Sequence, residues 1–331
     1  MRLPIYFDAR WNGPHGIGRF AAEIQQRLSG IETLPIMVRK LSPLDPLAIS
    51  LALANKRQGC YFPPGFNLPL SSPIPVIFTI HDLIHIKVPE ESSAIRRLYY
   101  ATVVRPAARR GWKILTVSLH SRQDIAEWAG IPETVISVVG NGVSSVFSSS
   151  GLHHAPGYPY LLHVGRRTGH KNIERLLAAF SRSRASRQLK LIFTGTPDAF
   201  TLDIAQRYGL TARVAFSGAT DDIALARIYR GATALVFPSL YEGFGLPVVE
   251  AMACGTPVIT SDATATREVA GIGNALLVPP KDIDALTEAI DCIVDDSVLR
   301  IELATRGLQR ARVFAWSDVA SRVIAALEIP H

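Results

Sequence analysis

Residues 235–259 read LVFPSLYEGFGLPVVEAMACGTPVI and form the most informative segment of the chain. An apolar run of strand length leads into the loop YEGFG, and Pro247 then stands near the first turn of a helix, where its missing N–H leaves no bond unmade. Gly255 ends that helix before the next strand. This order of strand, glycine loop and helix predicts an anion site, because backbone N–H groups and the helix dipole face the carboxyl edge of the sheet.

Two acids frame this loop. Glu242 opens it, and Glu250 follows eight residues later inside the expected helix. Because the loop reverses the chain, we expect both carboxylates to point into one crevice, where ionised acceptors bind ribose or hexose hydroxyls strongly. Taken alone, Glu250 would equally suit a solvated helix face; beside Glu242 and the glycine loop, ligand binding is the favoured interpretation.

A basic segment, HVGRRTGHKN at residues 163–172, follows another apolar run. Strand-to-helix turns at the carboxyl edge of a parallel sheet are where open α/β folds bind ligands. Arg166 supplies a guanidinium fork and Lys171 a point charge, a combination that suits a diphosphate. Arg167 and His170 are interpreted as solvated loop residues.

Apolar runs of strand length alternate with amphipathic stretches of helix length along the whole chain, which predicts an α/β fold with mainly parallel sheets. A segment rich in Ser, Gly and Pro at residues 144–159 is interpreted as a linker. We therefore expect domains at residues 1–150 and 156–314, followed by a last helix at 315–330. The expected strands are residues 3–7, 34–38, 75–80, 113–118, 135–139, 160–165, 189–195, 213–218, 233–239, 256–260 and 275–280.

Two features of the first half point to a ligand less strongly. GPHGIGR at residues 13–19 contains Gly16 and Gly18 but lacks the third glycine of a dinucleotide fingerprint, so we interpret it as a flexible loop that closes over phosphate or sugar. His81 and Asp82 follow the strand candidate PVIFTI. His81 is placed to bond a sugar hydroxyl, and a structural turn capped by Asp82 is the open alternative.

The composition limits the class of protein. Three scattered cysteines in 331 residues exclude a disulfide framework and a zinc site, and favour a reducing, cytoplasmic compartment. Neither a signal peptide nor an 18-residue apolar run is found. The net charge of +7 suits phosphates or an anionic membrane, whereas no nucleic-acid-binding motif is present. The basic stretch at residues 96–113 fits the inner membrane surface or an ordinary solvated helix.

The chain resembles the retaining glycosyltransferases of family 4, and the match covers nearly its whole length. These enzymes have the GT-B fold, in which two Rossmann-like domains with parallel sheets face each other across a donor cleft. The Glu242 and Glu250 pair and the basic pair in VGRRTGHKN carry the resemblance in combination. Weaker matches are GPHGIGR, the IHD turn at residues 80–82 and NGV at residues 141–143.

The resemblance implies a role for each site residue. Glu250 would bind ribose, Glu242 would contact the donor sugar near the reacting carbon, and Arg166 with Lys171 would neutralise the departing diphosphate. The remaining donor-site residues would be His81, Gly16, Gly18, Gly243, Phe244, Gly245 and Leu246. The helix at 315–330 would pack back on the first domain, which would bind the acceptor.

The reaction implied is transfer of a hexose with retention, without metal or cofactor. The first expectation for the donor is GDP-mannose, followed by a UDP-sugar. The acceptor would be a saccharide or lipid-linked oligosaccharide in surface polysaccharide synthesis. A sugar-nucleotide epimerase of the same fold and a non-catalytic sugar-nucleotide-binding module are the alternatives.

Overall fold

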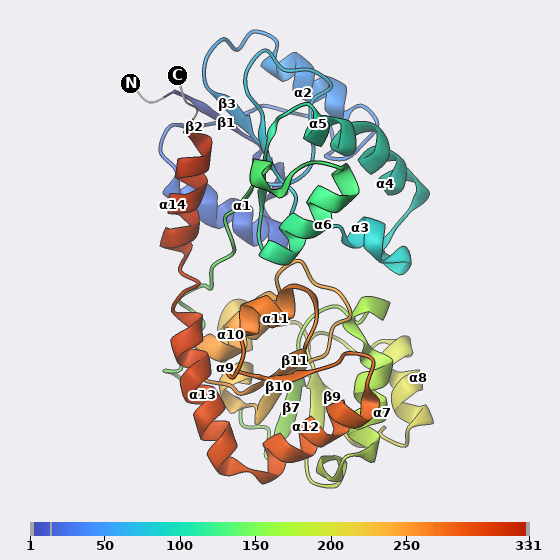
Figure 1. The fold of residues 1–331 in the computed structure, drawn as a ribbon. Helices are drawn as coiled ribbons and strands as arrows, with labels where there is room; N and C mark the ends of the chain where they lie inside the picture. The colour runs from blue at the N-terminus through green and yellow to red at the C-terminus, as the bar shows by residue number, and fades with distance from the viewer. Residues whose placement is uncertain (1–2, 14, 329–331) are drawn as a thin grey trace. The chain divides into compact units, whose positions relative to one another are not determined.

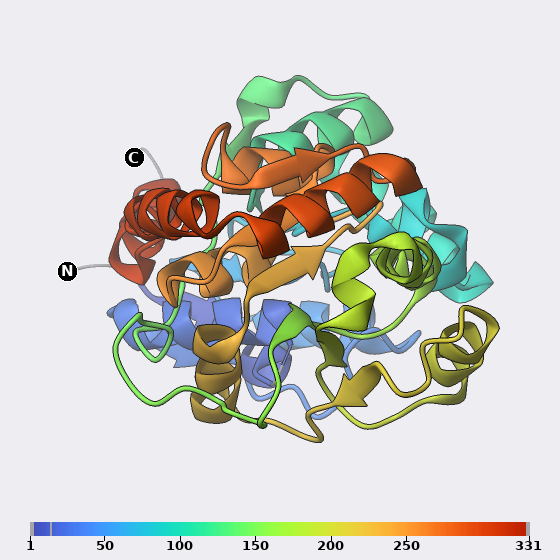
Figure 2. The same cartoon turned by 90° about the horizontal axis from the view of Figure 1, so that it is seen from below.

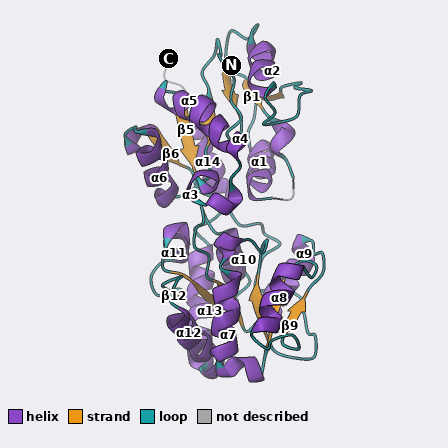
Figure 3. Cartoon of the chain, turned by 90° about the vertical axis from the view of Figure 1, so that its right-hand side faces the viewer, coloured by secondary structure: helices purple, strands orange, loops and turns teal. Residues whose placement is uncertain are grey.

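The computed structural model describes residues 3–13 and 15–328 (Figure 1). The chain forms two compact units: one runs to Gly142 and resumes at Ala315, and the other spans Val143–Phe314. Helices and strands alternate within each unit (Figure 3). The predicted α/β architecture of two Rossmann-like domains is confirmed. The units change at Gly142–Val143, whereas the sequence analysis placed the first boundary at residue 150.

The second unit, all of whose residues are described, is built on one six-stranded parallel sheet. Its order is β12-β11-β10-β7-β8-β9, so the chain fills one half of the sheet outward from β7 and then returns to begin the other half at β10. This is the order of a doubly wound sheet, and β7 and β10 meet at its topological switch point. The strands are β7 (Tyr160–His163), β8 (Lys190–Phe193), β9 (Val214–Phe216), β10 (Ala234–Phe237), β11 (Val258–Ser261) and β12 (Leu276–Val278).

Helices flank this sheet (Figure 2). One face packs on α7 and α12, whose apolar stripes bury Leu177, Phe180 and Ile290 against Leu161 and Val236 of the strands. These strands are buried on both faces, as expected where helices cover both. The helices are α7 (Ile173–Arg182), α8 (Ala199–Arg207), α9 (Asp222–Gly231), α10 (Leu246–Ala253), α11 (Thr264–Ala270), α12 (Ile283–Asp295) and α13 (Ser297–Ala311).

The first unit contains two three-stranded parallel sheets among its described residues, β2-β1-β3 and β4-β5-β6. A parallel bridge between Tyr61 and Val76 joins them. The strands are β1 (Ile5–Phe7), β2 (Ile31–Thr33), β3 (Cys60–Phe62), β4 (Ile77–Thr79), β5 (Lys113–Thr116) and β6 (Ile136–Val138). The helices are α1 (Gly16–Arg27), α2 (Asp45–Leu53), α3 (Ile84–Lys87), α4 (Ala94–Tyr99), α5 (Arg105–Arg109), α6 (Leu119–Ala129) and α14 (Trp316–Leu327).

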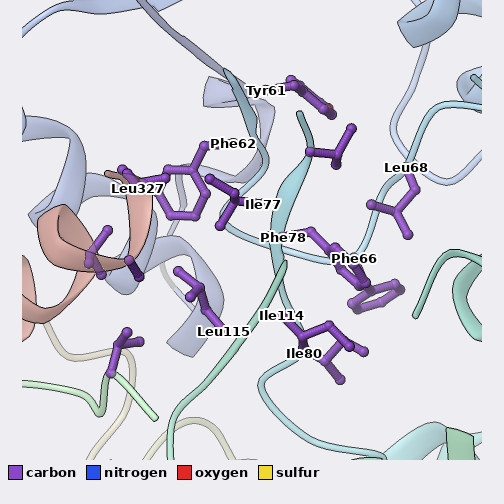
Figure 4. Close-up of a cluster of buried hydrophobic side chains, with 14 of the residues drawn as sticks. Tyr61, Phe62, Phe66, Leu68, Ile77, Phe78, Ile80, Ile114, Leu115 and Leu327 are labelled. Atoms are coloured by element: carbon purple, nitrogen blue, oxygen red, sulfur yellow. The ribbon is translucent and has the colours of Figure 1, made fainter. Parts of the chain in front are cut away.

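The core of the first unit is shared between its sheets and the last helix. Figure 4 shows Phe62, Ile77 and Leu115 of the strands near Leu327 of α14. Helix α14 contacts α1 and adds Trp316, among others, to this core. The carboxyl-terminal segment is thus part of the first unit, although the whole second unit precedes it in the sequence.

One strand prediction in the first unit was wrong, and one strand was missed. The strand expected at residues 34–38 is instead β2, Ile31–Thr33. Leu34 still donates to the carbonyl of Phe7 at 3.1 Å, but Pro35 has no N–H with which to continue the ladder. Strand β3 was not predicted, because its three residues lie between Gly59 and Pro63 and show no periodicity.

Candidate active site

Lys171 and Glu242 form an ion pair at the switch point of the second sheet. Lys171 ends a short 3₁₀ turn after β7, and Glu242 lies in the loop after β10. Lysine Nζ lies 2.5 Å from glutamate Oε1, and each side chain is only 13% exposed. The predicted convergence of these two residues is therefore observed as direct contact. Because α/β sheets bind ligands outside the carboxyl ends of the strands at this point, the pair occupies the expected place for a donor site.

The surroundings of the pair hold the Lys171 side chain and the two loops in place. Lys171 Nζ lies 4.8 Å from the centre of the Phe237 ring. The N–H of Leu240 donates to the carbonyl of His170 at 2.7 Å and so ties the two loops together. The N–H of Glu242 donates to Oγ1 of Thr264 at 3.3 Å. A charge held in this way is oriented before a ligand arrives, which is what electrostatic stabilisation of a leaving group requires.

Glu250 is buried rather than solvated. It lies in α10 with 6% of its surface exposed, and its Oε2 accepts a hydrogen bond from Tyr229 Oη at 2.9 Å. Tyr229 itself is fully buried in α9. A buried carboxylate needs hydrogen-bonding partners, so the solvated-face interpretation of Glu250 is excluded. Binding of a ribose by this residue stays a prediction.

The glycine loop enters α10 through a left-handed residue. Gly245 has φ of +97°, and a Cβ atom there would lie 3.2 Å from Cγ2 of Thr266. Phe244 is buried and packs edge-on against Phe314 with ring centres 5.7 Å apart. Leu246 is the first residue of α10. The expected order of strand, loop and helix is therefore present, whereas donor contacts of Gly243, Phe244, Gly245 and Leu246 stay predictions.

The basic segment after β7 differs from expectation at two positions. Arg166 is exposed, but Arg167 donates to the carboxylate of Asp198 and to the carbonyl of Thr196 at 2.5 Å. His170 is only 3% exposed. Arg167 and His170 were expected to be solvated, and this was wrong, because the segment after β8 reaches Arg167 and the loop after β10 covers His170.

His81 is a buried, neutral group of the first unit. Burial lowers its pKa to about 4, although the hydrogen bond with the carbonyl of Pro64 raises it in part and His15 lowers it again. Its Nε2 lies 2.9 Å from that carbonyl oxygen, so Nε2 carries the proton and Nδ1 is the acceptor nitrogen. Asp82 accepts from the N–H of Ile84 at 2.9 Å, which supports the structural-turn interpretation for Asp82.

Gly16 and Gly18 lie in the first turn of α1 rather than in a flexible loop. Gly18 N–H donates to Nδ1 of His15 at 2.9 Å, and a Cβ atom on Gly18 would lie 2.2 Å from the carbonyl oxygen of Gly13. Gly18 is thus required by close packing of the backbone, so its interpretation as part of a flexible loop was wrong, and contact of this segment with phosphate or sugar stays a prediction. Pro14 of this segment lies outside the described residues.

Asn172 is a site residue that the sequence analysis did not single out. It adopts φ of +61° at the start of α7, directly after Lys171. Its Nδ2 donates to the carbonyl of Pro238 at 2.9 Å and to that of Pro280 at 2.5 Å, so it joins the loops after β7, β10 and β12. The sequence could have indicated this role, because Asn172 stands where a helix is expected to start and Asn tolerates the left-handed conformation. Nothing in the sequence indicated Tyr229 or Thr264.

We expect Asn172→Asp to destabilise this edge of the sheet, because an oxygen would replace the amide nitrogen that faces two carbonyls. The variant loses two buried hydrogen bonds that contribute ~1 kcal/mol each. This loss lowers the melting temperature by roughly 4–8 °C in a unit of this size. Thermal unfolding measures the change. The matched control is Asn274→Asp, whose side chain makes one partly buried bond to the carbonyl of Ala270. An unchanged melting temperature for the Asn172 variant would show that this link has no structural role.

Comparison with known proteins identifies the family. The family model described as Glycosyltransferase Family 4 matches residues 59–146, and that described as Glycosyl transferases group 1 matches residues 148–312. The chain belongs to glycosyltransferase family 4. The second match contains Lys171, Glu242 and Glu250, so the ion pair at the switch point lies within the matched residues.

Two curated relatives of this glycosyltransferase are named mannosyltransferases. O-antigen chain mannosyltransferase B of Escherichia coli is 29% identical over 91% of this chain and 82% of that protein. MMP alpha-(1->4)-mannosyltransferase of Mycolicibacterium hassiacum is 32% identical over 71% of this chain and 58% of that protein. The chain thus spans little more than half the length of the second relative.

Solved structures confirm the GT-B fold of the glycosyltransferase. Sucrose-phosphate synthase from Thermosynechococcus elongatus superposes with a TM-score of 0.80 at 21% identity, covering 98% of each chain. Anabaena HepE in complex with UDP and glucose gives a TM-score of 0.76 at 18% identity, covering 98% of this chain and 99% of that one. Across residues 3–13 and 15–328, none of the helices combines the length and apolar character needed to span a bilayer.

Proposed function

We propose that this glycosyltransferase moves a mannosyl group from GDP-mannose, with retention of configuration, to a saccharide or lipid-linked oligosaccharide of a surface polysaccharide. The ion pair of Lys171 with Glu242 at the switch point carries the proposal, because it puts a fixed cation where a diphosphate would leave. The choice of mannose is supported by the names of two relatives, an O-antigen chain mannosyltransferase and a second mannosyltransferase.

The proposed step exchanges one bond at the anomeric carbon for another. The bond from this carbon to the diphosphate oxygen breaks, a bond to the acceptor oxygen forms, and the acceptor proton passes to the donor phosphate. Positive charge develops on the sugar and negative charge on the diphosphate in the transition state. Lys171 and Arg166 stabilise the leaving diphosphate without a metal, and they do so more in the transition state than before it.

The remaining site residues position the donor. Glu250 accepts hydrogen bonds from the ribose, and the loop Gly243–Leu246 lies against the sugar. His81, with Nδ1 as its acceptor nitrogen, accepts a hydrogen bond from a sugar hydroxyl. Gly16 offers a backbone N–H at the start of α1, whereas the N–H of Gly18 is already bound by His15.

A UDP-sugar is the second candidate donor, since HepE, which has the same fold, was solved with UDP and glucose. The location of the protein in the cytoplasm, at the inner face of the membrane, also belongs to the proposal. The cytoplasmic part is supported by Cys60, Cys254 and Cys292, which are all free thiols.

The test is a thermal-shift screen across GDP, UDP, ADP and their sugars, followed by transfer to saccharide acceptors and NMR analysis of the product's anomeric configuration. A donor at 100 times its Kd stabilises the folded state by ~2.7 kcal/mol. We expect GDP and GDP-mannose to give the largest shift, and activity to persist in excess EDTA. If only UDP-sugars raise the melting temperature, a UDP-sugar rather than GDP-mannose is the donor. Donor binding without transfer to any acceptor would indicate a binding module.

A further inference from the structure

Helix α2 of the first unit exposes a row of leucines. Leu44, at its amino-terminal boundary, is 64% exposed, Leu47 is 47% exposed and Leu51 is 68% exposed. Their spacing of three and four residues puts them on one side of the helix. Isolated exposed leucines are common on protein surfaces, but an aligned row on one helix needs an explanation.

Leu70 lies beside this helix, next to Pro46 and Ser50. It is 52% exposed, and its N–H donates to the carbonyl of Pro46 at 3.3 Å and to Oγ of Ser50 at 2.9 Å, which fixes it beside α2. Its own carbonyl accepts from Nη1 of Arg110 at 3.1 Å, at the end of α5. We call Leu44, Leu47, Leu51 and Leu70 the leucine face.

Cations surround the leucine face. Arg39 is exposed in the turn before α2, Arg57 is exposed just after it, and Arg110 is exposed beside Leu70. Between Glu32 and Asp82 the sequence has a single acid, Asp45, which is fully buried and pairs with Arg10 at 2.7 Å. Glu32, which is 57% exposed, lies 3.9 Å from Lys56 beside the end of α2, so the described residues around this face present leucines and an excess of positive charge.

We propose that the leucine face is the surface by which this protein docks on an anionic lipid bilayer. Apolar side chains that enter the boundary between headgroups and acyl chains, flanked by Arg that meet lipid phosphates, are the combination that holds a helix in a membrane interface. A second copy of the chain fits less well, because a symmetric contact would bring Arg39, Arg57 and Arg110 of one copy against the same excess of cations on the other.

The basic stretch at residues 96–113 is the weaker membrane candidate. It is broken into α4, a π-helical turn at Tyr100–Val104 and α5. Ile95 and Leu98 are exposed on α4, but acidic Glu90 and Glu91 precede it closely, and Arg96 donates to the carbonyl of Glu91 at 3.2 Å. Arg110, near the end of this stretch, lies instead beside Leu70 of the leucine face.

The experiment is co-sedimentation of the purified protein with vesicles of phosphatidylcholine alone or mixed with phosphatidylglycerol, at low salt. We expect binding to the mixed vesicles only, and weaker binding as salt screens the charges. Leu51→Asp is expected to lower the partition coefficient at least ~10-fold, and Arg57→Glu with Arg110→Glu by a similar factor. The matched control is Ile301→Asp on α13 of the second unit, because Ile301 is also 68% exposed.

Each outcome bears on the proposal. Unchanged melting temperatures and an unchanged thermal shift with GDP show that the variants fold and that donor binding, on which this inference does not depend, is intact. Absence of wild-type binding to mixed vesicles overturns the proposal, as does equal loss of binding in the Ile301 variant. Sedimentation as a dimer that Leu51→Asp dissociates, without vesicle binding, would assign the face to a second copy instead.

Discussion

Lys171→Ala is expected to lower the turnover number by ~100-fold or more, a loss comparable to removing one preorganised donor to a developing negative charge. The reason is that Lys171, which Glu242 holds at 2.5 Å at the switch point, is proposed to face the leaving diphosphate. Glu242→Ala is expected to cost a similar factor, because the cation loses the partner that orients it. Initial rates at saturating donor and acceptor measure both effects.

A matched change elsewhere on the same sheet is the control. Lys190 lies at the start of β8, at the amino-terminal ends of the strands and away from Lys171. Its Nζ is 4.4 Å from the ring centre of Tyr158. Lys190→Ala should retain near wild-type turnover. Since Lys171 and Glu242 act as a unit, their double variant should lose little more than the worse single variant. Turnover near that of the wild type in the Lys171 variant would exclude it from the chemistry.

Glu250→Gln is expected to raise the donor KM by roughly 10- to 100-fold with little change in turnover number. Hydrogen bonds to a charged group contribute ~1.5–3 kcal/mol, and this carboxylate is proposed to hold the ribose, which does not change charge in the reaction. Initial rates measure the donor KM and the turnover number separately, and calorimetric titration measures the dissociation constant of the donor.

Two further variants separate positioning from simple loss of charge. Tyr229→Phe removes the hydroxyl that donates to Glu250 at 2.9 Å, and should raise the donor KM by a smaller factor of ~3–5, in line with one hydrogen bond. Glu302→Gln, at a half-exposed acid on α13, should leave KM unchanged. A fall in turnover with unchanged KM for Glu250→Gln would place this residue at the reacting carbon rather than at the ribose.

Much of the site could be predicted because parallel strands end at a common edge. Residues that follow β7 and β10 must meet if those strands are neighbours, and both apolar runs were recognisable in the sequence. The sequence did not reveal that they are neighbours, since strand order depends on long-range packing. It also did not indicate that Lys171 and Glu242 would be in contact, because a bond of 2.5 Å depends on loop geometry.

The failures share a physical cause, which is that local patterns cannot reveal tertiary partners. Gly18 looked like a source of flexibility, but the close approach of Gly13 is what requires a glycine there. Arg167 was predicted to be solvated, but in the structure it pairs with Asp198 from the segment after β8. Strand β3 is too short for periodicity, and its pairing with β1 on one side and Val76 on the other defines it.

The most direct measurement is a crystal structure of the protein with GDP-mannose or its unreactive analogue. We predict that a diphosphate oxygen lies ~3 Å from Lys171 Nζ and that a ribose hydroxyl lies within hydrogen-bond distance of the Glu250 carboxylate. A sugar nucleotide bound at any other edge of the second sheet, with Lys171 and Glu242 paired only to each other, would contradict it.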